Sequence, residues 1–161
     1  MPKNEIGSWF EDFIWKELQA SQARTKPTPL VHKFVDSKTA RGFVSAQPSD
    51  FLITYKLGTV YLEVKASEKQ NNLPLSMIRD QQIAHARLVC DCNNAPSPHP
   101  YQVLFFSEPQ NTVTFWAGHE IAAAKAKRRK LEAKRSTCFE LTWHDFELEL
   151  NTTGLIDLLN W

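Results

Sequence analysis

The segment that most constrains the fold runs from residue 48 to residue 65, where the order of apolar residues predicts a β-hairpin. We place its turn at Leu57-Gly58, because glycine accepts the positive φ that a tight turn requires. In that register one face of the two strands, 50–56 and 59–67, is entirely apolar. The residues on this face are Phe51, Ile53, Tyr55, Val60, Leu62 and Val64. Such a face must be buried, so the segment predicts a half-buried hairpin.

The opposite face of the same hairpin carries charged side chains. Glu63 and Lys65 are two residues apart on one strand and therefore point the same way. The register above places Asp50 opposite Lys65 on the other strand. Two carboxylates and an ammonium group are what metal-dependent phosphodiester hydrolysis requires. The residues alone also allow a second interpretation, in which these charges form a solvated strand face with a weak surface pair.

The composition is that of a globular protein. The chain has 161 residues, 42% of them hydrophobic and 23% charged, and this predicts a single domain with its own core over residues 1–161. Its three cysteines lack a zinc-ligand spacing and indicate a reduced, cytoplasmic protein. The first residues do not resemble a signal peptide, and no apolar segment has the length of a membrane span. No phosphate-binding or dinucleotide fingerprint occurs, so we expect neither a membrane partner nor a nucleotide cofactor.

The charge is distributed unevenly, although the net value is only +1. Residues 125–135 contain seven Lys or Arg and one Glu, and residues 24–41 contain five Lys or Arg and one Asp. Local basic segments on an otherwise acidic chain favour a polyanionic partner. A solvated helix face is the alternative for residues 125–135.

The remaining periodicities give an order of elements. The spacing predicts a helix over 5–22, then strands of a short projecting segment around 30–47, at 30–35 and 41–47. After the hairpin we expect a helix over 76–90 with Ser76 as its N-cap, strands at 103–107 and 112–116, a helix over 119–135, a strand at 138–143 and a helical tail at 154–161. This order predicts an α/β fold with a mixed central sheet flanked by helices.

Four short stretches between residues 7 and 85 occur in an order that matches a known family. They are Gly7-Ser-Trp-Phe-Glu11, Lys26-Pro-Thr-Pro29, Gln47-Pro-Ser-Asp50 with Gly58-Thr-Val-Tyr-Leu-Glu-Val-Lys65, and Leu73-Pro-Leu75 with Asp80-Gln-Gln-Ile-Ala-His85. Together they resemble the RecU-type Holliday junction resolvases, a branch of the PD-(D/E)xK nucleases. The segment between Pro29 and Asp50 is shorter than the stalk of the bacterial members, and Gln81 replaces a histidine of the family motif.

The resemblance implies a restriction-endonuclease-like domain with a metal-dependent site. Asp50 and Glu63 would bind Mg²⁺, for which Mn²⁺ would substitute, with help from the backbone carbonyl of Val64. Glu11 would complete or orient the metal shell from the first helix. Lys65 would orient the attacking water or counter charge on the phosphoryl oxygens.

The resemblance also implies DNA contacts. Gln82, the last catalytic candidate, would hydrogen-bond a metal-bound water or a phosphate. Lys26 and Thr28 would contact phosphates near the cleavage point. The other DNA-binding candidates, which would hold the backbone without reading its sequence, are Arg79, His85, Lys127, Arg128, Arg129 and Lys130.

The implied activity is endonucleolytic resolution of four-way (Holliday) junctions by paired symmetric nicks in recombination or repair. The two-fold symmetry of a junction favours a homodimer with two identical sites. The protein would act in a bacterial cytoplasm, either as a host protein or as one encoded by a phage. Two alternatives remain open. One is a nuclease for flaps, nicks or foreign duplex, and the other is a junction-binding protein without catalysis.

Overall fold

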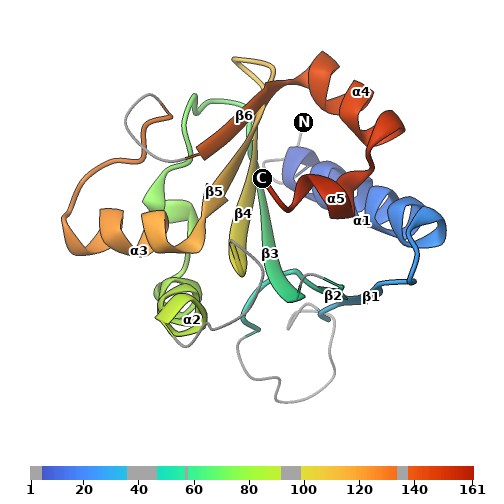
Figure 1. The fold of residues 1–161 in the computed structure, drawn as a ribbon. Coiled ribbons are helices and arrows are strands. Elements are labelled where there is room, and N and C mark those ends of the chain that lie inside the picture. Colours follow the sequence, from blue (N-terminus) through green and yellow to red (C-terminus); the bar gives the residue numbers. More distant parts are fainter. Residues whose placement is uncertain (1–4, 36–46, 57, 92–98, 134–137) are drawn as a thin grey trace.

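Six strands form a mixed sheet that lies between two layers of helices in the computed structural model (Figure 1). The structure describes residues 5–35, 47–56, 58–91, 99–133 and 138–161. Its strands are β1 Leu30–Lys33, β2 Phe51–Tyr55, β3 Gly58–Ser67, β4 Tyr101–Ser107, β5 Thr112–Ala117 and β6 Cys138–Thr142. Its helices are α1 Glu5–Arg24, α2 Asp80–Asp91, α3 Gly118–Ala126, α4 Trp143–Thr152 and α5 Leu155–Leu158, with a 3-10 turn η1 at Leu75–Met77.

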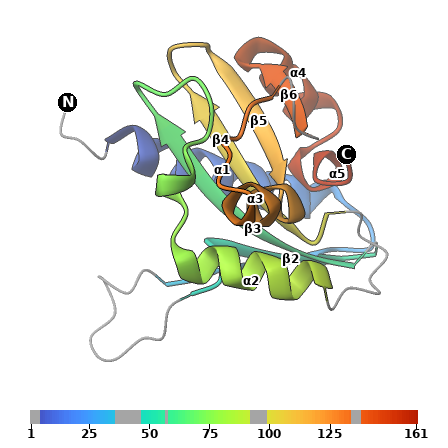
Figure 2. The same cartoon turned by 90° about the vertical axis from the view of Figure 1, so that its left-hand side faces the viewer.

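The strands lie in the sheet in their sequence order, from β1 to β6. β3 and β4 pair in parallel, whereas every other neighbouring pair is antiparallel. A parallel pair needs a long connection, which here contains η1 and α2. Helices α2 and α3 cover one face of the sheet, and α1, α4 and α5 cover the other (Figures 1 and 2). The predicted α/β class, a mixed central sheet flanked by helices, is confirmed.

Two hydrophobic cores lie on the two faces. The first core packs Phe10, Ile14 and Leu18 of α1 against β3 and β4 and includes residues of α4 and α5. The second core includes Ile83 of α2 and Ile121 of α3, together with residues of β4 and β5. Because β4 is covered on both faces, all seven of its residues are buried, which explains its apolar run from Val103 to Phe106.

The hairpin forms, but its predicted register is wrong. Tyr55 pairs with Gly58, so the turn is centred one residue earlier than Leu57-Gly58 and every cross-strand pair shifts by two. Leu52 consequently faces Tyr61, and the ladder brings Asp50 beside Glu63 rather than opposite Lys65. A shift of two leaves each residue on its predicted face, because side chains alternate with a period of two. The apolar face of the hairpin is buried in the first core as expected.

Two predicted helices have different bounds in the structure. The helix expected from residue 76 begins at Asp80, because the chain forms η1 and then an extended residue at Ile78, so Ser76 is not an N-cap. The helix expected to reach residue 135 ends at Ala126, and Arg128 takes a positive φ of 51°. The basic residues 127–130 therefore lie in a loop.

The helix α4 was not predicted from the sequence. Thr142, at the end of β6, caps this helix with its hydroxyl, which accepts the N–H of Asp145 at 3.1 Å. The helical tail is confirmed at α5. In the projecting segment β1 is described, whereas the strand expected at 41–47 lies almost wholly outside the described residues. None of the helices in the described ranges is both long and apolar enough to cross a membrane.

Candidate active site

Asp50 is held against β3 by a short network. Its Oδ2 atom accepts the backbone N–H of Val64 at 2.7 Å, and its backbone carbonyl accepts the N–H of Phe34 at 2.9 Å. Just before it in the chain, the carbonyl of Pro48 accepts the hydroxyl of Tyr101, at 2.6 Å. Contacts from β3, from β4 and from the residue after β1 therefore fix Asp50 at the entry to β2.

Glu63 lies on the face of β3 that the second core covers. Its side chain is 1% exposed, and its strand neighbour in β4 is Val103. Oε1 forms an ion pair with Nζ of Lys65, whose side chain is 22% exposed. Oε2 is buried and has no hydrogen-bond partner among the described residues. A buried carboxylate oxygen without a partner is costly, so the site suits a cation at that atom.

The site has an excess of negative charge. Burial and the neighbouring Glu63 carboxylate raise the pKa of Asp50 to about 7, although Lys65 and the Val64 N–H oppose the shift. Burial also raises the pKa of Tyr101, and both carboxylates add to that effect. Each shift reports unbalanced negative charge in a poorly solvated place, which is the electrostatic condition that a divalent cation relieves.

The site offers a cation a small number of oxygen ligands. Val64 directs its N–H to Asp50, and in an extended strand the carbonyl of the same residue lies on the same edge. Asp50, Glu63 and this carbonyl could thus hold one cation together. Within the described ranges, no group of three or more His, Cys, Asp or Glu is arranged as a metal centre. Two carboxylates with water fit Mg²⁺, which keeps several waters, better than zinc, which prefers nitrogen and sulfur ligands.

Glu11 is near the site but belongs to another ion pair. Its Oε1 atom lies 3.2 Å from Nζ of Lys33, which also lies 3.9 Å from Asp12 and over the ring of Phe51. Its charge contributes the smallest of the effects on the pKa of Asp50. The structure therefore places Glu11 beside the site, paired with a lysine of β1.

Gln82 has a structural contact that was not predicted from the sequence. The side chain is buried, and its Oε1 atom accepts the backbone N–H of Arg79 at 3.0 Å. It thereby satisfies an N–H group before the first turn of α2, where such groups lack helical partners. The oxygen that would meet a metal-bound water is already in use.

The predicted DNA-binding residues fall into three groups. Lys26 and Thr28 are exposed and lie 3.4 Å apart, between Nζ and Oγ1. His85 is half-buried and its Nδ1 atom has no partner in the described part of the chain. The remaining candidates lie near the start of α2 and after α3. They are Arg79, Lys127, Arg128, Lys130, all exposed, and Arg129, which is paired with Glu120 at 2.9 Å.

Two contributors to the site were missed. Tyr101 holds the Pro48 carbonyl, and Lys33 pairs with Glu11. The sequence offers only a tyrosine before an apolar strand and a lysine in a basic segment, so neither residue had a local signal.

Comparison with known proteins gives a structural likeness and no match among family models or curated sequences. Among solved structures, the chain is similar to Hjc, a Holliday junction resolvase from Archaeoglobus fulgidus. That match has 16% sequence identity and a TM-score of 0.48, and covers 96% of this chain and 100% of the archaeal chain. At these values the likeness carries neither a family nor an activity to this protein.

Proposed function

We propose that this protein is a Mg²⁺-dependent endonuclease that resolves four-way DNA junctions by paired symmetric nicks. The observation that carries the proposal is the juxtaposition of Asp50 with the buried Glu63 and its ion-pair partner Lys65. The unpartnered Oε2 atom of Glu63 supports a cation-binding role. The motif order from Gly7 to His85 supplies the substrate class.

Each residue has a defined task in this proposal. Bound Mg²⁺ supplies charge neutralisation at the scissile phosphate and a water of lowered pKa, and Mn²⁺ supplies the same. Asp50, Glu63 and the Val64 carbonyl hold the ion. Lys65, partly exposed, orients the water or balances charge on the phosphoryl oxygens. Glu11, paired with Lys33, adds negative charge at the rim of the site.

Cutting a junction resolves it only when two strands are cut at symmetric positions. A homodimer provides two identical sites for this purpose. Lys26 and Thr28 are exposed and available to phosphates near the cut. Gln82, whose oxygen caps α2, retains an amide N–H₂ group that can donate to a phosphate.

The test is a cleavage assay with a labelled four-way junction, compared with a linear duplex, a flap and a single strand. We expect paired symmetric nicks in the junction with Mg²⁺ or Mn²⁺ and none without a divalent metal. Glu63→Gln and Lys65→Ala should each abolish cutting. Lys16→Ala removes an exposed lysine of α1, on the opposite face of the sheet, and should leave cutting unchanged.

Other results would change the proposal in defined ways. Preferential cutting of flaps or duplex would keep the site and assign it to a different DNA substrate. Tight junction binding without cutting under any divalent metal would reject the nuclease and leave a junction-binding protein.

A further inference from the structure

A broad groove lies on the α2 and α3 side of the molecule. Its volume is about 1160 Å³, and it is bounded by the loop 69–76, the start of α2 and the segment 125–132 that ends and follows α3. Figure 2 shows α2 and α3 in front of the sheet on this side. We call it the basic groove, because six cationic side chains line it against two acidic ones. The cations are Lys69, Arg79, Lys125, Arg128, Arg129 and Lys130.

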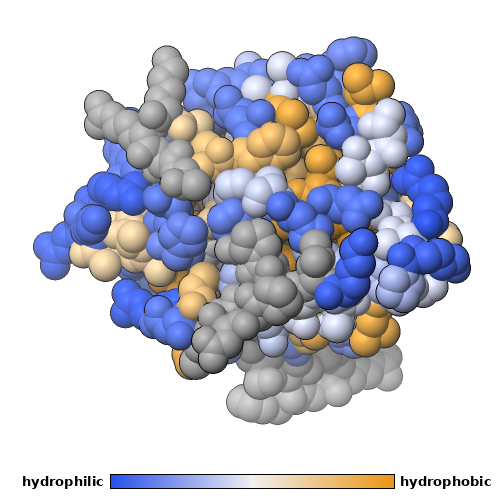
Figure 3. Space-filling view, viewed as in Figure 1, coloured by the Kyte–Doolittle hydropathy of each residue, from blue (hydrophilic) through white to orange (hydrophobic). Residues whose placement is uncertain are grey.

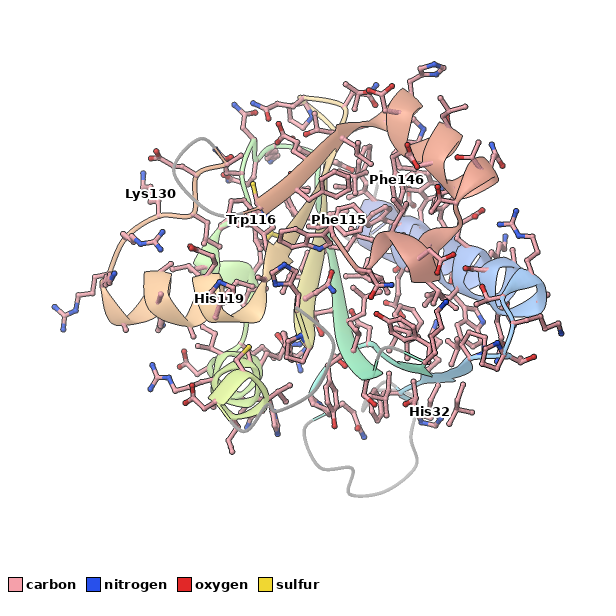
Figure 4. All side chains as sticks on the ribbon, viewed as in Figure 1. His32, Phe115, Trp116, His119, Lys130 and Phe146 are labelled. Carbon is pink, nitrogen blue, oxygen red and sulfur yellow. The ribbon has the colours of Figure 1, made fainter. Side chains whose placement is uncertain are left out.

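Most of the cations in the basic groove are not paired with acidic side chains of the described residues. Lys125 pairs with Asp80 at 3.2 Å and Arg129 pairs with Glu120 at 2.9 Å. The other four cations, all exposed, form no ion pair with any described residue. Lys130 extends outward from the segment after α3 (Figure 4), and hydrophilic residues surround the free end of α3 (Figure 3). A local concentration of cations on a chain of net charge +1 calls for an anionic partner.

The lining also indicates which part of a nucleic acid would be bound. No aromatic side chain is among the described lining residues, so the groove has no platform on which bases could stack. Asn71 and Asn72 add amide donors beside the cations. Cations and amides are the groups that contact phosphate oxygens, and such contacts position a nucleic acid without reading its sequence.

The chain links the candidate active site on β3 directly to the groove. Lys69 follows Lys65 by four residues, just beyond the end of β3, and Arg79 donates its backbone N–H to Gln82. We infer that the basic groove binds the phosphodiester backbone of a DNA arm that leaves the cutting site, independently of base sequence. The inference rests on the proposed function for its choice of DNA, and it names the surface that holds the arm.

The first test measures binding separately from cutting. Fluorescence anisotropy with a labelled four-way junction and a labelled linear duplex would be recorded in the Glu63→Gln background, over a range of salt concentrations. Arg128→Ala combined with Lys130→Ala should weaken junction binding about tenfold and reduce the slope of log K against log salt by about two. Lys16→Ala combined with Lys56→Ala removes two exposed lysines outside the groove and should leave affinity unchanged.

A variant that gains affinity guards against effects of misfolding. Asp80 is 87% exposed and holds Lys125 across the groove. Asp80→Asn removes an acidic group and releases that lysine, so we expect junction binding to tighten about twofold to threefold at low salt. The gain should disappear at high salt.

These experiments distinguish a failure of the groove inference from a failure of the proposed nuclease function. If the groove variants bind as tightly as the lysine control while the wild-type protein nicks junctions, the groove inference is wrong and the nuclease stands. If the wild type never cuts but binding follows the groove charges, the nuclease is wrong and the groove stands. A strong dependence of affinity on base sequence would overturn the backbone-only mode.

Discussion

The two faces of the sheet are built for different purposes. The face under α1, α4 and α5 carries buried side chains that are almost all apolar, with Phe10, Phe106 and Phe146 in an aromatic cluster around Trp143. The face under α2 and α3 is also largely apolar, but it contains the buried carboxylate of Glu63 with one oxygen unpartnered. Burial on the first face is thus stabilising throughout, whereas the buried carboxylate on the second face lowers the stability of the fold.

This contrast explains where chemistry can occur in a small sheet protein. An unpaired charge inside the first core would have no access to solvent or substrate. On the second face, Glu63 lies beside Asp50, the residue before β2, and the side chain of Lys65 is 22% exposed. A reactive group can therefore be buried enough to be perturbed and still lie at a boundary with the solvent.

The largest expected effect comes from removing a side chain of the first core. Phe146 is fully buried and contacts the ring of Phe115 edge-on, with centroids 6.1 Å apart. Phe146→Ala should lower the free energy of unfolding by about 3–5 kcal/mol, because it leaves a cavity. Urea denaturation measures this. Leu148→Ala, on the same helix but 55% exposed, should cost less than about 0.5 kcal/mol. Equal costs for both variants would show that α4 does not seal the core.

The sequence predicted the elements whose signal is local. Period-two alternation indicated β2 and β3, and a 3.6-residue apolar stripe indicated α1. The helix α4 was missed because residues 146–150 read Phe-Glu-Leu-Glu-Leu, and this period-two alternation competes with the helical spacing of Trp143, Phe146 and Leu150. Packing against β5, a distant part of the chain, and the Thr142 cap select the helix over a strand.

The candidate site was predictable in part. Strand periodicity alone places Glu63 and Lys65 on one face. The burial of Glu63 was not predictable, because it depends on pairing with Val103 and on helices from later in the chain. The register error had the same origin: several two-residue turns fit the residues around Gly58, and only the complete sheet selects one.

The second prediction concerns the charge of Asp50. Its pKa in the folded protein is about 7, against 3.8 in an unfolded chain. The native state therefore binds more protons between these values, and stability falls as the pH rises from about 4 to 7. Asp50→Asn removes this loss while its amide oxygen can still accept the Val64 N–H. Above pH 7 the free energy of unfolding of the variant should exceed that of the wild type by about 2 kcal/mol. This is half of what the whole pKa shift would give, because Asp50 is partly exposed.

Thermal unfolding at a series of pH values, in the presence of a chelator, tests this difference. The two proteins should have the same stability below about pH 4, where Asp50 is protonated in both states. A constant difference at all pH values would show that the carboxylate charge is not its cause.

The third prediction adds the metal to the same comparison. Mg²⁺ that binds only the folded protein should stabilise it by about 1.4 kcal/mol at ten times its Kd. The gain should vanish in Asp50→Asn and in Glu63→Gln, and it should shrink below pH 7 as Asp50 takes up a proton. Calorimetric titration with Mg²⁺ measures the binding directly. Equal binding to Glu63→Gln would place the ion elsewhere.

The smallest expected effect concerns Tyr101, which positions the site from β4. Tyr101→Phe removes the hydroxyl that donates to the Pro48 carbonyl at 2.6 Å, at a cost of about 1 kcal/mol. Because Asp50 follows Pro48 by two residues, the looser segment should bind Mg²⁺ more weakly. We expect a higher Mg²⁺ concentration for half-maximal cleavage and a nearly unchanged rate at saturation. Tyr61→Phe is the matched control, since the Tyr61 ring stacks on Tyr101 with centroids 6.4 Å apart and its hydroxyl forms no hydrogen bond with a described residue. A change in the saturated rate alone would mean that the Tyr101 hydroxyl acts on the reaction itself. The Val64 N–H and the strand pairing would then be sufficient to position Asp50.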